Sequence, residues 1–489
     1  MAETSRQSVA AVVLLLCIVF GVIAIVSPLL LRYGLGLMLP PSAYHLNMTA
    51  AEHAALISSH RFVVVGGPHR GGTTIFWRLL AAHPMVSGFP EHGVATDFAE
   101  GAFLQSVLPT FGVGAELLGA VRRRDSGLGR YAFSPQAHLT EAHALNTNAS
   151  SLRLLSEWGY HWNLSRPVLL EKTPTDMLTS RLLQSLLTPR ATSFVFVTRH
   201  PLAVALAHRA WHCCRSMSVP SLALHWLVAH RVLASDVPHL RRARLLRYED
   251  LVLRPQKCLQ RVLKWLGLPA PADATAHSVR AATAPAGAHS GGHDSVAGVL
   301  ASVAPDANRK YERQYCSRAH LKTRKQARAH CAMAVALQPA IDELRLGYDL
   351  RQGGSLGFAC VGRRLADKGF APPRPRTATP ASAGRQLRRK KRGGGSGGGG
   401  GSGGDGGGSG SGGHGHRRTG VGNQTRARSY GHGAGVCEGV QPDRKLVDAL
   451  RTHEAAVLAA EAGPHAPRRL QLGGGNERQL CHYKRKDES

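Results

Sequence analysis

The sequence predicts an α/β fold in which helices cover both faces of a central parallel sheet, a three-layer sandwich. The first observation is that apolar, strand-like runs alternate with runs of helical period between residues 61 and 350. The second is that these apolar runs lack polar alternation, which is typical of parallel strands buried on both faces. The predicted strands cover residues 61–66, 168–170, 193–198 and 243–248.

Each predicted strand is followed by a segment with the period of an amphipathic helix. These predicted helices cover residues 73–82, 176–187, 202–211 and 255–266. Helical crossovers join parallel strands, because a parallel partner begins at the far end of the previous strand. Residues 61–350 are therefore predicted to form one α/β domain.

The chain is long and strongly basic. It has 489 residues, and its 61 Lys and Arg against 31 Asp and Glu give a formal net charge of +30. This excess favours acidic partners, namely nucleic acid, an anionic membrane surface, an anionic glycan or a multiply charged cofactor. A multispan membrane protein is excluded, because the chain has a single long apolar run.

That apolar run, residues 9–31, contains no charged side chain and is long enough to cross a bilayer. We expect a transmembrane signal anchor with residues 1–8 as a cytosolic tail and residues 32–60 as a lumenal stem. The alternative is a cleaved signal peptide, whose apolar core is normally shorter. Either interpretation sends the rest of the chain into the secretory pathway.

Two further features agree with a secretory destination. Glycosylation sequons begin at Asn47, Asn148, Asn163 and Asn423. Eight cysteines lie outside the predicted anchor, and one or two disulfides are expected in an oxidising compartment. The spacing does not fix their pairing and does not suggest a metal site.

The carboxyl-terminal part, residues 351–489, is predicted to be a low-complexity, disordered tail. Residues 393–415 contain 17 glycines among 23 positions, with serines between them, and such a segment has few side chains to bury. Residues 441–463 are the exception and predict one short amphipathic helix.

The first predicted strand runs into a glycine-rich turn, residues 66–74, that opens a helix. Such a turn presents backbone N–H groups and the positive end of the helix dipole to an anion, so it predicts a phosphate-binding loop. A nucleotide triphosphatase loop would carry lysine where Thr73 stands, and the cation here is instead Arg70 inside the loop. The alternative is a purely structural glycine turn.

Arg199 follows the third predicted strand and precedes a helix. An arginine at the carboxyl end of a parallel strand suits bidentate phosphate binding. The alternative is an arginine held in a surface ion pair.

These motifs resemble the sulfotransferases that use 3′-phosphoadenosine 5′-phosphosulfate, the P-loop-like group whose Golgi membrane type includes the tyrosylprotein sulfotransferases. The run PHRGGTT over residues 68–74, followed by Ala82-His83-Pro84, is similar to that family's 5′-phosphosulfate loop and helix. The resemblance continues through residues 169–174, 193–211 and 246–268 to Leu346-Gly347-Tyr348-Asp349. It implies a catalytic domain over residues 61–350 and a single-pass type II protein of the Golgi membrane.

The resemblance also implies roles for individual residues. Arg70, Gly71, Gly72, Thr73 and Thr74 would hold the 5′-phosphosulfate, Arg199 the 3′-phosphate, Tyr248 would approach the nucleotide, and Lys172 would lie near the transferred group. Gly71 and Ala207 stand where the family carries serines, so two hydroxyl contacts to the donor are missing.

A hydroxyl acceptor needs a general base. Glu91 has the same offset from the loop helix as the catalytic glutamate of the tyrosylprotein group, and His92 is the neighbouring alternative. The alternative for Glu91 is a solvated loop carboxylate. No metal ion is expected to take part.

The acceptor is expected to be a hydroxyl of a glycan or glycolipid, because the arginines that grip acidic peptides in the tyrosylprotein group are missing after Glu91. Protein tyrosine remains an alternative. The other classes are a nucleotide kinase and a noncatalytic lumenal binding protein. Nucleic acid is not an expected partner, since the basic surface would be lumenal. The sequence leaves a homodimer open.

Overall fold

A computed structural model describes residues 44–90, 100–109, 127–270, 295–305, 308–316, 320–351, 356–368, 437 and 440–460. Its centre is a five-stranded sheet built from β1 (Arg61–Gly66), β2 (Val86–Gly88), β3 (Val168–Lys172), β4 (Thr192–Thr198) and β5 (Ala243–Arg247). The strands lie in the order β2-β3-β1-β4-β5, and every neighbouring pair is parallel.

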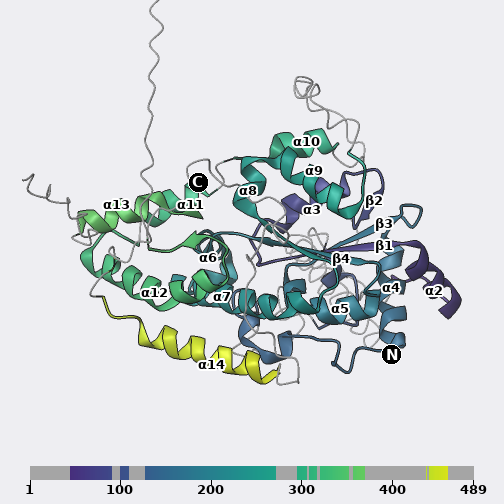
Figure 1. Cartoon of the computed structure of the whole chain (residues 1–489), viewed down its shortest axis with the longest axis horizontal. Helices are drawn as coiled ribbons and strands as arrows, with labels where there is room; N and C mark the ends of the chain where they lie inside the picture. Colours follow the sequence, from purple (N-terminus) through teal and green to yellow (C-terminus); the bar gives the residue numbers. More distant parts are fainter. Residues whose placement is uncertain are drawn as a thin grey trace, which may run out of the picture.

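The helices lie on both sides of this sheet, which confirms the predicted α/β sandwich. Figure 1 shows α3, α8, α9 and α10 on one side and α5 and α7 on the other. The helices on the two sides and around them are α2 (Ala50–Ser59), α3 (Thr73–Ala81), α4 (Asn148–His161), α5 (Ser180–Leu187), α6 (Pro201–Arg209), α7 (Val219–Asp236), α8 (Tyr248–Leu253), α9 (Pro255–Leu266) and α10 (Val296–Ser302).

Further elements lie mainly after the sheet in the sequence. These are α11 (Arg309–Gln314), α12 (Arg324–Glu343), the short parallel pair β6 (Tyr348–Asp349) and β7 (Leu356–Gly357), α13 (Ala359–Asp367) and α14 (Arg444–Ala460). Single 3-10 turns are η2 (Gly101–Phe103), η3 (Tyr131–Phe133), η4 (Pro135–Ala137), η5 (Pro174–Met177), η6 (His212–Cys214) and η7 (Val237–His239).

The predicted strands are all present, with small differences at their ends. β1 has the predicted bounds, β3 continues to Lys172, and β4 begins at Thr192. Two elements had no clear sequence signal. β2 is a three-residue edge strand, too short for a pattern, and α7 is buried almost all round, so it lacks an amphipathic stripe.

The order of the strands fixes where a ligand can bind. β1 lies at the centre, with β3 on one side and β4 on the other, so the carboxyl ends of β3, β1, β4 and β5 form one continuous edge. In open α/β sheets, ligands bind at this edge, where the order of the strands switches direction. The predicted loop and Arg199 both lie on it.

The amino-terminal segments are described only in part. The predicted stem contains α2, whose first turn is closed by a capping box between Thr49 and Glu52. The predicted anchor, residues 9–31, lies outside the described residues. Among the helices that are described, none combines the length and the apolar character that a membrane crossing requires.

The described parts of residues 351–489, which the sequence assigns to the tail, pack on the α/β domain. α14 lies against α7 and α12 (Figure 1), and Arg231 of α7 forms an ion pair with Glu454 of α14. A disulfide between Cys331 and Cys437 links α12 to the chain just before α14. Hence the helix predicted within residues 441–463 is part of the folded body.

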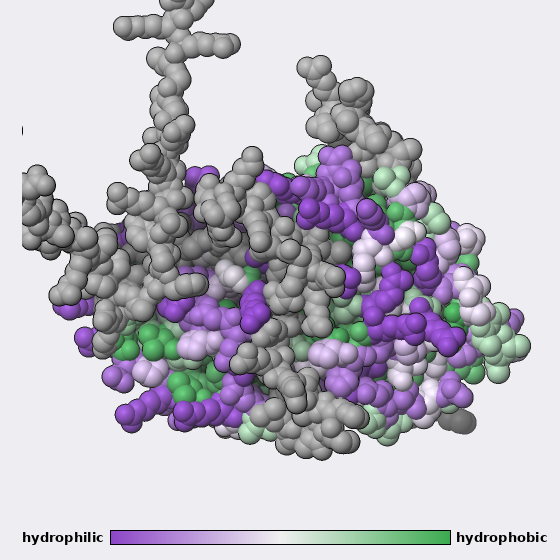
Figure 2. Space-filling view, viewed as in Figure 1, coloured by the Kyte–Doolittle hydropathy of each residue, from purple (hydrophilic) through white to green (hydrophobic). Residues whose placement is uncertain are grey.

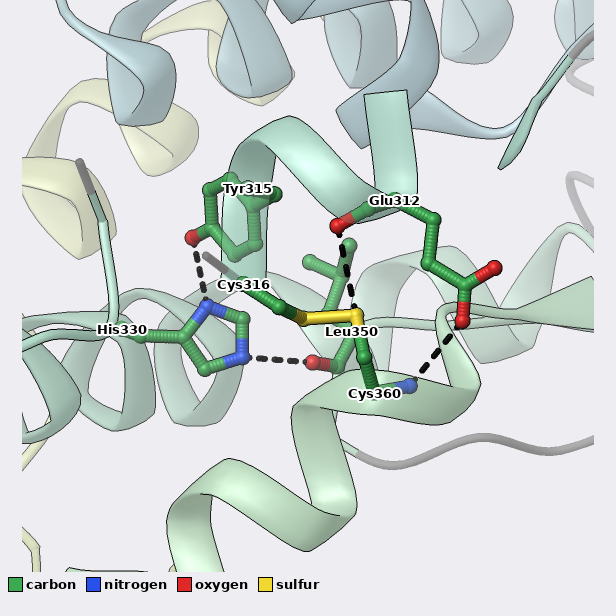
Figure 3. The surroundings of a disulfide bond; sticks show 6 residues. All are labelled: Glu312, Tyr315, Cys316, His330, Leu350 and Cys360. Carbon is green, nitrogen blue, oxygen red and sulfur yellow. Dashed lines mark hydrogen bonds between the residues drawn. A yellow bond between two sulfur atoms is a disulfide. The ribbon is translucent and has the colours of Figure 1, made fainter. Parts of the chain in front are cut away.

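A second disulfide joins Cys316, just after α11, to Cys360 in α13. Figure 3 shows its surroundings, in which the backbone N–H of Cys360 donates to Glu312 of α11 at 3.0 Å. Next to it, His330 of α12 lies between the hydroxyl of Tyr315 and the carbonyl of Leu350, each 2.7 Å away. The bridge and these bonds fix the position of α11 against α12 and α13.

The described surface carries few exposed apolar side chains. In Figure 2, hydrophilic residues cover most of the described surface on the face in view. The large apolar side chains that are exposed among the described residues are Tyr160 and Leu253, and they are isolated from each other in the fold. Apolar surface therefore does not mark a docking face in this part of the chain.

Candidate active site

The glycine-rich loop joins β1 to α3 at the carboxyl edge of the sheet. Two backbone bonds shape it, from Gly67 N to the carbonyl of Pro174 at 3.0 Å and from Gly71 N to that of Pro68 at 2.8 Å. Arg70 has a positive φ of 64°, which turns the chain tightly back toward the helix. The predicted loop is thus present at the predicted place.

α3 begins without a side-chain cap, since its N-cap is Gly72, which has a φ of 102°. A helix start of this kind leaves first-turn N–H groups for an anion, where the helix dipole adds a partial positive charge. Thr73 and Thr74, the first two residues of α3, line the cavity in front of the loop. The helix start can therefore hold a phosphate or sulfate group.

The cavity has a volume of about 870 Å³, enough for a nucleotide-sized ligand. Basic and aromatic side chains dominate its described walls. The described lining residues are His69, Arg70, Gly72, Thr73, Thr74, Ile75, Glu100, Phe103, Leu128, Pro174, Arg199, Trp211, Cys213, Tyr248, Ala304, Arg309, Lys310, Tyr311 and Arg313.

Arg199 is held in place from several directions. Its guanidinium carbon lies 4.2 Å from the ring centroid of Tyr248 and 5.2 Å from that of Tyr311. Its Nε donates to Asn308 Oδ1 at 2.7 Å, and Nη1 donates to the carbonyl of Arg70 at 3.1 Å. The side chain is 6% exposed, so these contacts place a largely desolvated cation in the cavity wall.

Arg70 supplies a second cation on the loop itself. Its guanidinium carbon lies 4.8 Å from the centroid of Trp211, which follows α6. This stacking leaves the guanidinium in the wall of the cavity, beside the start of α3. Two arginines from different strand ends therefore face one cavity, an arrangement that suits the binding of phosphate groups.

α11 forms a further basic wall, which the sequence did not predict. Arg309, Lys310, Tyr311 and Arg313 all line the cavity, and the Cys316–Cys360 bridge lies at the end of this helix (Figure 3). The available sequence signal was the basic pair before Tyr311. It could not be assigned, since only the fold brings α11 to the carboxyl edge of the sheet.

Lys172 lies beneath the cavity wall and not among its described lining residues. Its ammonium group is fully buried and lies 2.9 Å from Glu100 Oε1. Glu100, unlike Lys172, does line the cavity. Lys172 is thus separated from the cavity by Glu100, a carboxylate that the sequence analysis did not identify.

Two more buried carboxyl groups lie beside Lys172, on Glu171 and Asp176. Burial and the neighbouring Glu171 raise the pKa of Asp176 well above its ordinary value, and burial also raises the pKa of Glu171. A proton on Asp176 lets the two groups share a hydrogen bond without two adjacent negative charges. The buried pair of Glu171 and Asp176 therefore carries at most one negative charge.

Buried histidines surround the back of the loop. Burial lowers the pKa of His69 well below its ordinary value, and the charges of Lys172 and Arg70 lower it further. Burial also lowers the pKa of His208 to about 4. His208 adjoins Ala207, the position at which a serine was expected, so neither residue offers a hydroxyl to a ligand there.

The predicted site residues fall into three groups. Arg70, Gly72, Thr73, Thr74, Arg199 and Tyr248 line one cavity, as expected for a shared ligand. Gly71 is buried in the loop, and Lys172 lies behind Glu100. The predicted bases Glu91 and His92 lie outside the described residues. Within the described part of the chain, no cluster of three or more His, Cys, Asp or Glu side chains could hold a metal ion.

The fold and this anion-binding edge define a class of enzyme. Residues 62–272 match the model of the sulfotransferase family. The match supports a sulfotransferase enzyme. This assignment agrees with the resemblance seen in the sequence motifs.

Solved structures give more distant similarities. The sulfotransferase domain of the Synechococcus PCC 7002 olefin synthase is 21% identical, covering 43% of this chain and 74% of that chain, with a TM-score of 0.25. A Mycobacterium avium sulfotransferase is 15% identical, covering 48% of this chain and 70% of that chain, with a TM-score of 0.29. No curated protein sequence matches the chain significantly. The similarity to the sulfotransferase family rests on the match over residues 62–272.

Proposed function

We propose that this protein moves a sulfuryl group from 3′-phosphoadenosine 5′-phosphosulfate to a hydroxyl group of a glycan or glycolipid in the secretory pathway. The observation that carries the proposal is the shared cavity of the loop, with Arg70 and the start of α3, and of Arg199 at the end of β4. Two separate cationic centres suit a donor with anionic groups at its 5′ and 3′ positions.

The two anionic groups of the donor can be assigned to the two cationic sides of the cavity. The loop N–H groups, Arg70, Thr73 and Thr74 suit the 5′-phosphosulfate, with Gly71 shaping the turn. Arg199, with Tyr248 stacked on it, suits the 3′-phosphate. The basic residues of α11 add positive charge on the same side. Sulfuryl transfer resembles phosphoryl transfer, in which positioning and charge neutralisation supply most of the catalysis.

Two observations support a secretory location. The chain forms two described disulfides, Cys316–Cys360 and Cys331–Cys437, which persist in oxidising compartments. The three sequon asparagines in the described residues, Asn47, Asn148 and Asn163, are exposed. We propose a type II protein of the Golgi membrane held by residues 9–31.

The test uses the full chain, purified in mild detergent, with the sulfur-35-labelled donor. Separate reactions contain glycans, glycolipids and tyrosine peptides, and binding of the product 3′-phosphoadenosine 5′-phosphate is measured by calorimetry. We expect product binding in the micromolar range and label transfer to a glycan or glycolipid. Transfer to tyrosine peptides alone would reassign the acceptor, and failure of both binding and transfer would refute the proposal.

A nucleotide kinase is the rival, because a cavity of this kind could also accept ATP. It lacks the loop lysine, since Thr73 occupies that position. Parallel reactions with labelled ATP and Mg²⁺ separate the two classes. We expect no phosphoryl transfer.

A further inference from the structure

Glu100 is the only carboxylate among the described residues that line the cavity. It lies directly before η2 and is 9% exposed. The sequence pattern did not single it out, since it stands in a loop far from the recognised motifs. Glu100 thus places a single negative charge among basic, aromatic and apolar side chains.

Residues 171–173, at the end of β3, bind residues 100–102. Lys172 Nζ pairs with Glu100 Oε1 at 2.9 Å, Gly101 N donates to Glu171 Oε1 at 3.2 Å, and Ala102 N donates to Thr173 Oγ1 at 3.0 Å. This one-to-one pairing fixes both the backbone and the carboxylate of Glu100. A rigid mount of this kind is what a group acting in a reaction needs.

The segment that holds Glu100 is tightly packed as well as hydrogen-bonded. Trp158 Nε1 donates to the carbonyl of Gly101 at 3.0 Å. A Cβ atom on Gly101 would lie 2.7 Å from Glu171 Oε1, so only glycine fits between Glu100 and the strand end. The position of Glu100 is therefore set by the core of the protein and not by solvent.

These contacts involve only one oxygen of the Glu100 carboxylate. Lys172 takes Oε1, and no described side chain or backbone group bonds Oε2. Because Glu100 lines the cavity, Oε2 is the atom that a ligand can reach. The geometry thus offers one fixed, accessible acceptor of a proton beside the loop.

We propose that Glu100 is the general base of the transfer, which rests on the proposed function. Glu100 Oε2 takes the proton of the acceptor hydroxyl as its oxygen forms a bond to sulfur. The bond from sulfur to the 5′-phosphate oxygen breaks, and its electron pair stays on the departing 3′-phosphoadenosine 5′-phosphate. The neutral Glu100 later releases its proton to water. Lys172 acts as a positioning residue, which orients the carboxylate through its contact with Oε1.

The charges around Glu100 agree with this role. Burial raises the pKa of Glu100, while the charge and hydrogen bond of Lys172 oppose the rise. The other titratable groups near Glu100 are Glu171, Asp176 and Tyr131. Like burial, the charge of Glu171 raises the pKa of Glu100. A more basic carboxylate takes up a hydroxyl proton more readily.

His69 is the other described group in the cavity that could accept a proton. Burial, His208, Lys172 and Arg70 all disfavour its protonated form and hold its pKa well below the ordinary value. Its Nδ1 is also buried without a bond to any described residue. A base must hold the proton it takes, so Glu100 is better suited than His69.

The decisive experiment compares Glu100→Gln with Glu91→Gln in the full chain. Steady-state kinetics give kcat and KM over pH 5 to 9, and calorimetry gives the affinity for 3′-phosphoadenosine 5′-phosphate. We expect Glu100→Gln to lower kcat by about 10² to 10⁴-fold, with product affinity within twofold of wild type. The control is Glu141→Gln, an exposed carboxylate that pairs with Arg181 and does not line the cavity, and it should keep kcat within threefold.

The pH profile separates a base from a merely structural residue. We expect the acidic limb of the wild-type profile to disappear in Glu100→Gln and to persist in Glu91→Gln. Lys172→Met should move that limb to higher pH, because loss of the ammonium raises the pKa of Glu100. Glu100→Asp, which keeps the carboxylate, should recover part of kcat.

Several outcomes would overturn the inference. These are unchanged kcat in Glu100→Gln, loss of the acidic limb in Glu91→Gln instead, or a parallel loss of product affinity and melting temperature in Glu100→Gln. If the wild-type protein binds no donor and transfers no sulfate, the proposed function fails first. Donor turnover by wild type together with normal kcat in Glu100→Gln refutes only the role of Glu100.

Discussion

The ring of Tyr248 lies directly against Gly72, so that a Cβ atom on the glycine would be 2.2 Å from Cδ2 of the ring. Gly72 also has a positive φ of 102°. The contact brings the end of β5 onto the start of α3. The glycine-rich loop is therefore in direct contact with the ring that stacks on Arg199.

This contact predicts that Gly72→Ala impairs the site. The new methyl group must displace Tyr248 or the loop, and the φ value is unfavourable for alanine. We expect affinity for 3′-phosphoadenosine 5′-phosphate to fall at least about tenfold, or about 1.4 kcal/mol, in calorimetry. Gly298→Ala in α10, where the nearest atom is 3.4 Å from the added carbon, should leave affinity unchanged. Equal effects of both variants would contradict the prediction.

Arg199→Ala should weaken donor binding by about 10 to 150-fold, because a charge-assisted bond to a phosphate contributes about 1.5 to 3 kcal/mol. Arg199→Lys should recover only part of the affinity, since lysine cannot stack on Tyr248 and bind bidentately at once. The measurement is a calorimetric titration with the bisphosphate product. The matched control is Arg190→Ala, an exposed arginine before β4 at the opposite edge of the sheet. Normal binding by Arg199→Ala would remove this residue from the donor site.

Cys437→Ser should lower the stability of the domain. The Cys331–Cys437 bridge spans 106 residues and ties α14 to α7 and α12. Loss of a disulfide that closes a long loop costs about 2 to 4 kcal/mol. Urea unfolding of the oxidised protein measures the change, with Cys213→Ser, an exposed cysteine outside any disulfide, as the control. An unfolding midpoint equal to that of the control would show that α14 adds no stability.

Cys360→Ser should act mainly on the site. Its bridge to Cys316 anchors α11, whose residues Arg309 and Lys310 line the cavity. We expect donor affinity to fall about three- to tenfold, whereas Cys437→Ser should leave it within twofold, because α14 does not line the cavity. A free-energy loss of this size is about 1 kcal/mol. The opposite pattern in calorimetry would mean that α11 keeps its position without the bridge.

Acid should destabilise the protein below pH 6.5. Burial lowers the pKa of His200 and His330 to about 4 and of His230 to about 3. The unfolded chain binds these protons near pH 6.5 and the folded chain does not, so the stabilising contribution is present above pH 6.5 and lost on acidification. Each histidine contributes a slope of about 1.4 kcal/mol per pH unit.

Buried carboxyl groups act in the opposite direction. The raised pKa of Asp176 lets the folded state hold a proton that the unfolded state has lost, so its contribution favours folding as the pH falls. The histidines outnumber such carboxyl groups among the described residues, so we expect a net loss. Urea unfolding at pH 4.5, 5.5, 6.5 and 7.5 measures the direction, and stability that rises toward pH 4.5 would contradict it.

Much of the fold could be predicted because its signals are local. β1 and the loop after it carry an apolar run and a glycine pattern within a few residues of each other. Arg199 could be singled out for the same reason, as an arginine at the end of β4. By contrast, β2 is too short for a pattern, and the surface of α7 is buried all round by tertiary contacts.

The tail illustrates how composition can mislead. The glycine-rich stretch between residues 393 and 415 favoured a low-complexity, disordered tail over residues 351–489 that contains one short helix. α14 nevertheless packs on α7, through an ion pair between Arg231 and Glu454 and through the bridge at Cys437. Pairing of distant cysteines depends on the three-dimensional path of the chain, which spacing alone does not reveal.

The class of fold, the glycine-rich loop and the position of Arg199 at a strand end could be predicted from the sequence, because each depends on neighbouring residues. The contact between Glu100 and Lys172, which are 72 residues apart, and the place of α11 in the cavity wall could be seen only in the folded chain. The physical reason is that parallel strand order brings distant chain segments to one edge of the sheet. The composition of a chemical site at that edge is therefore a property of the folded chain.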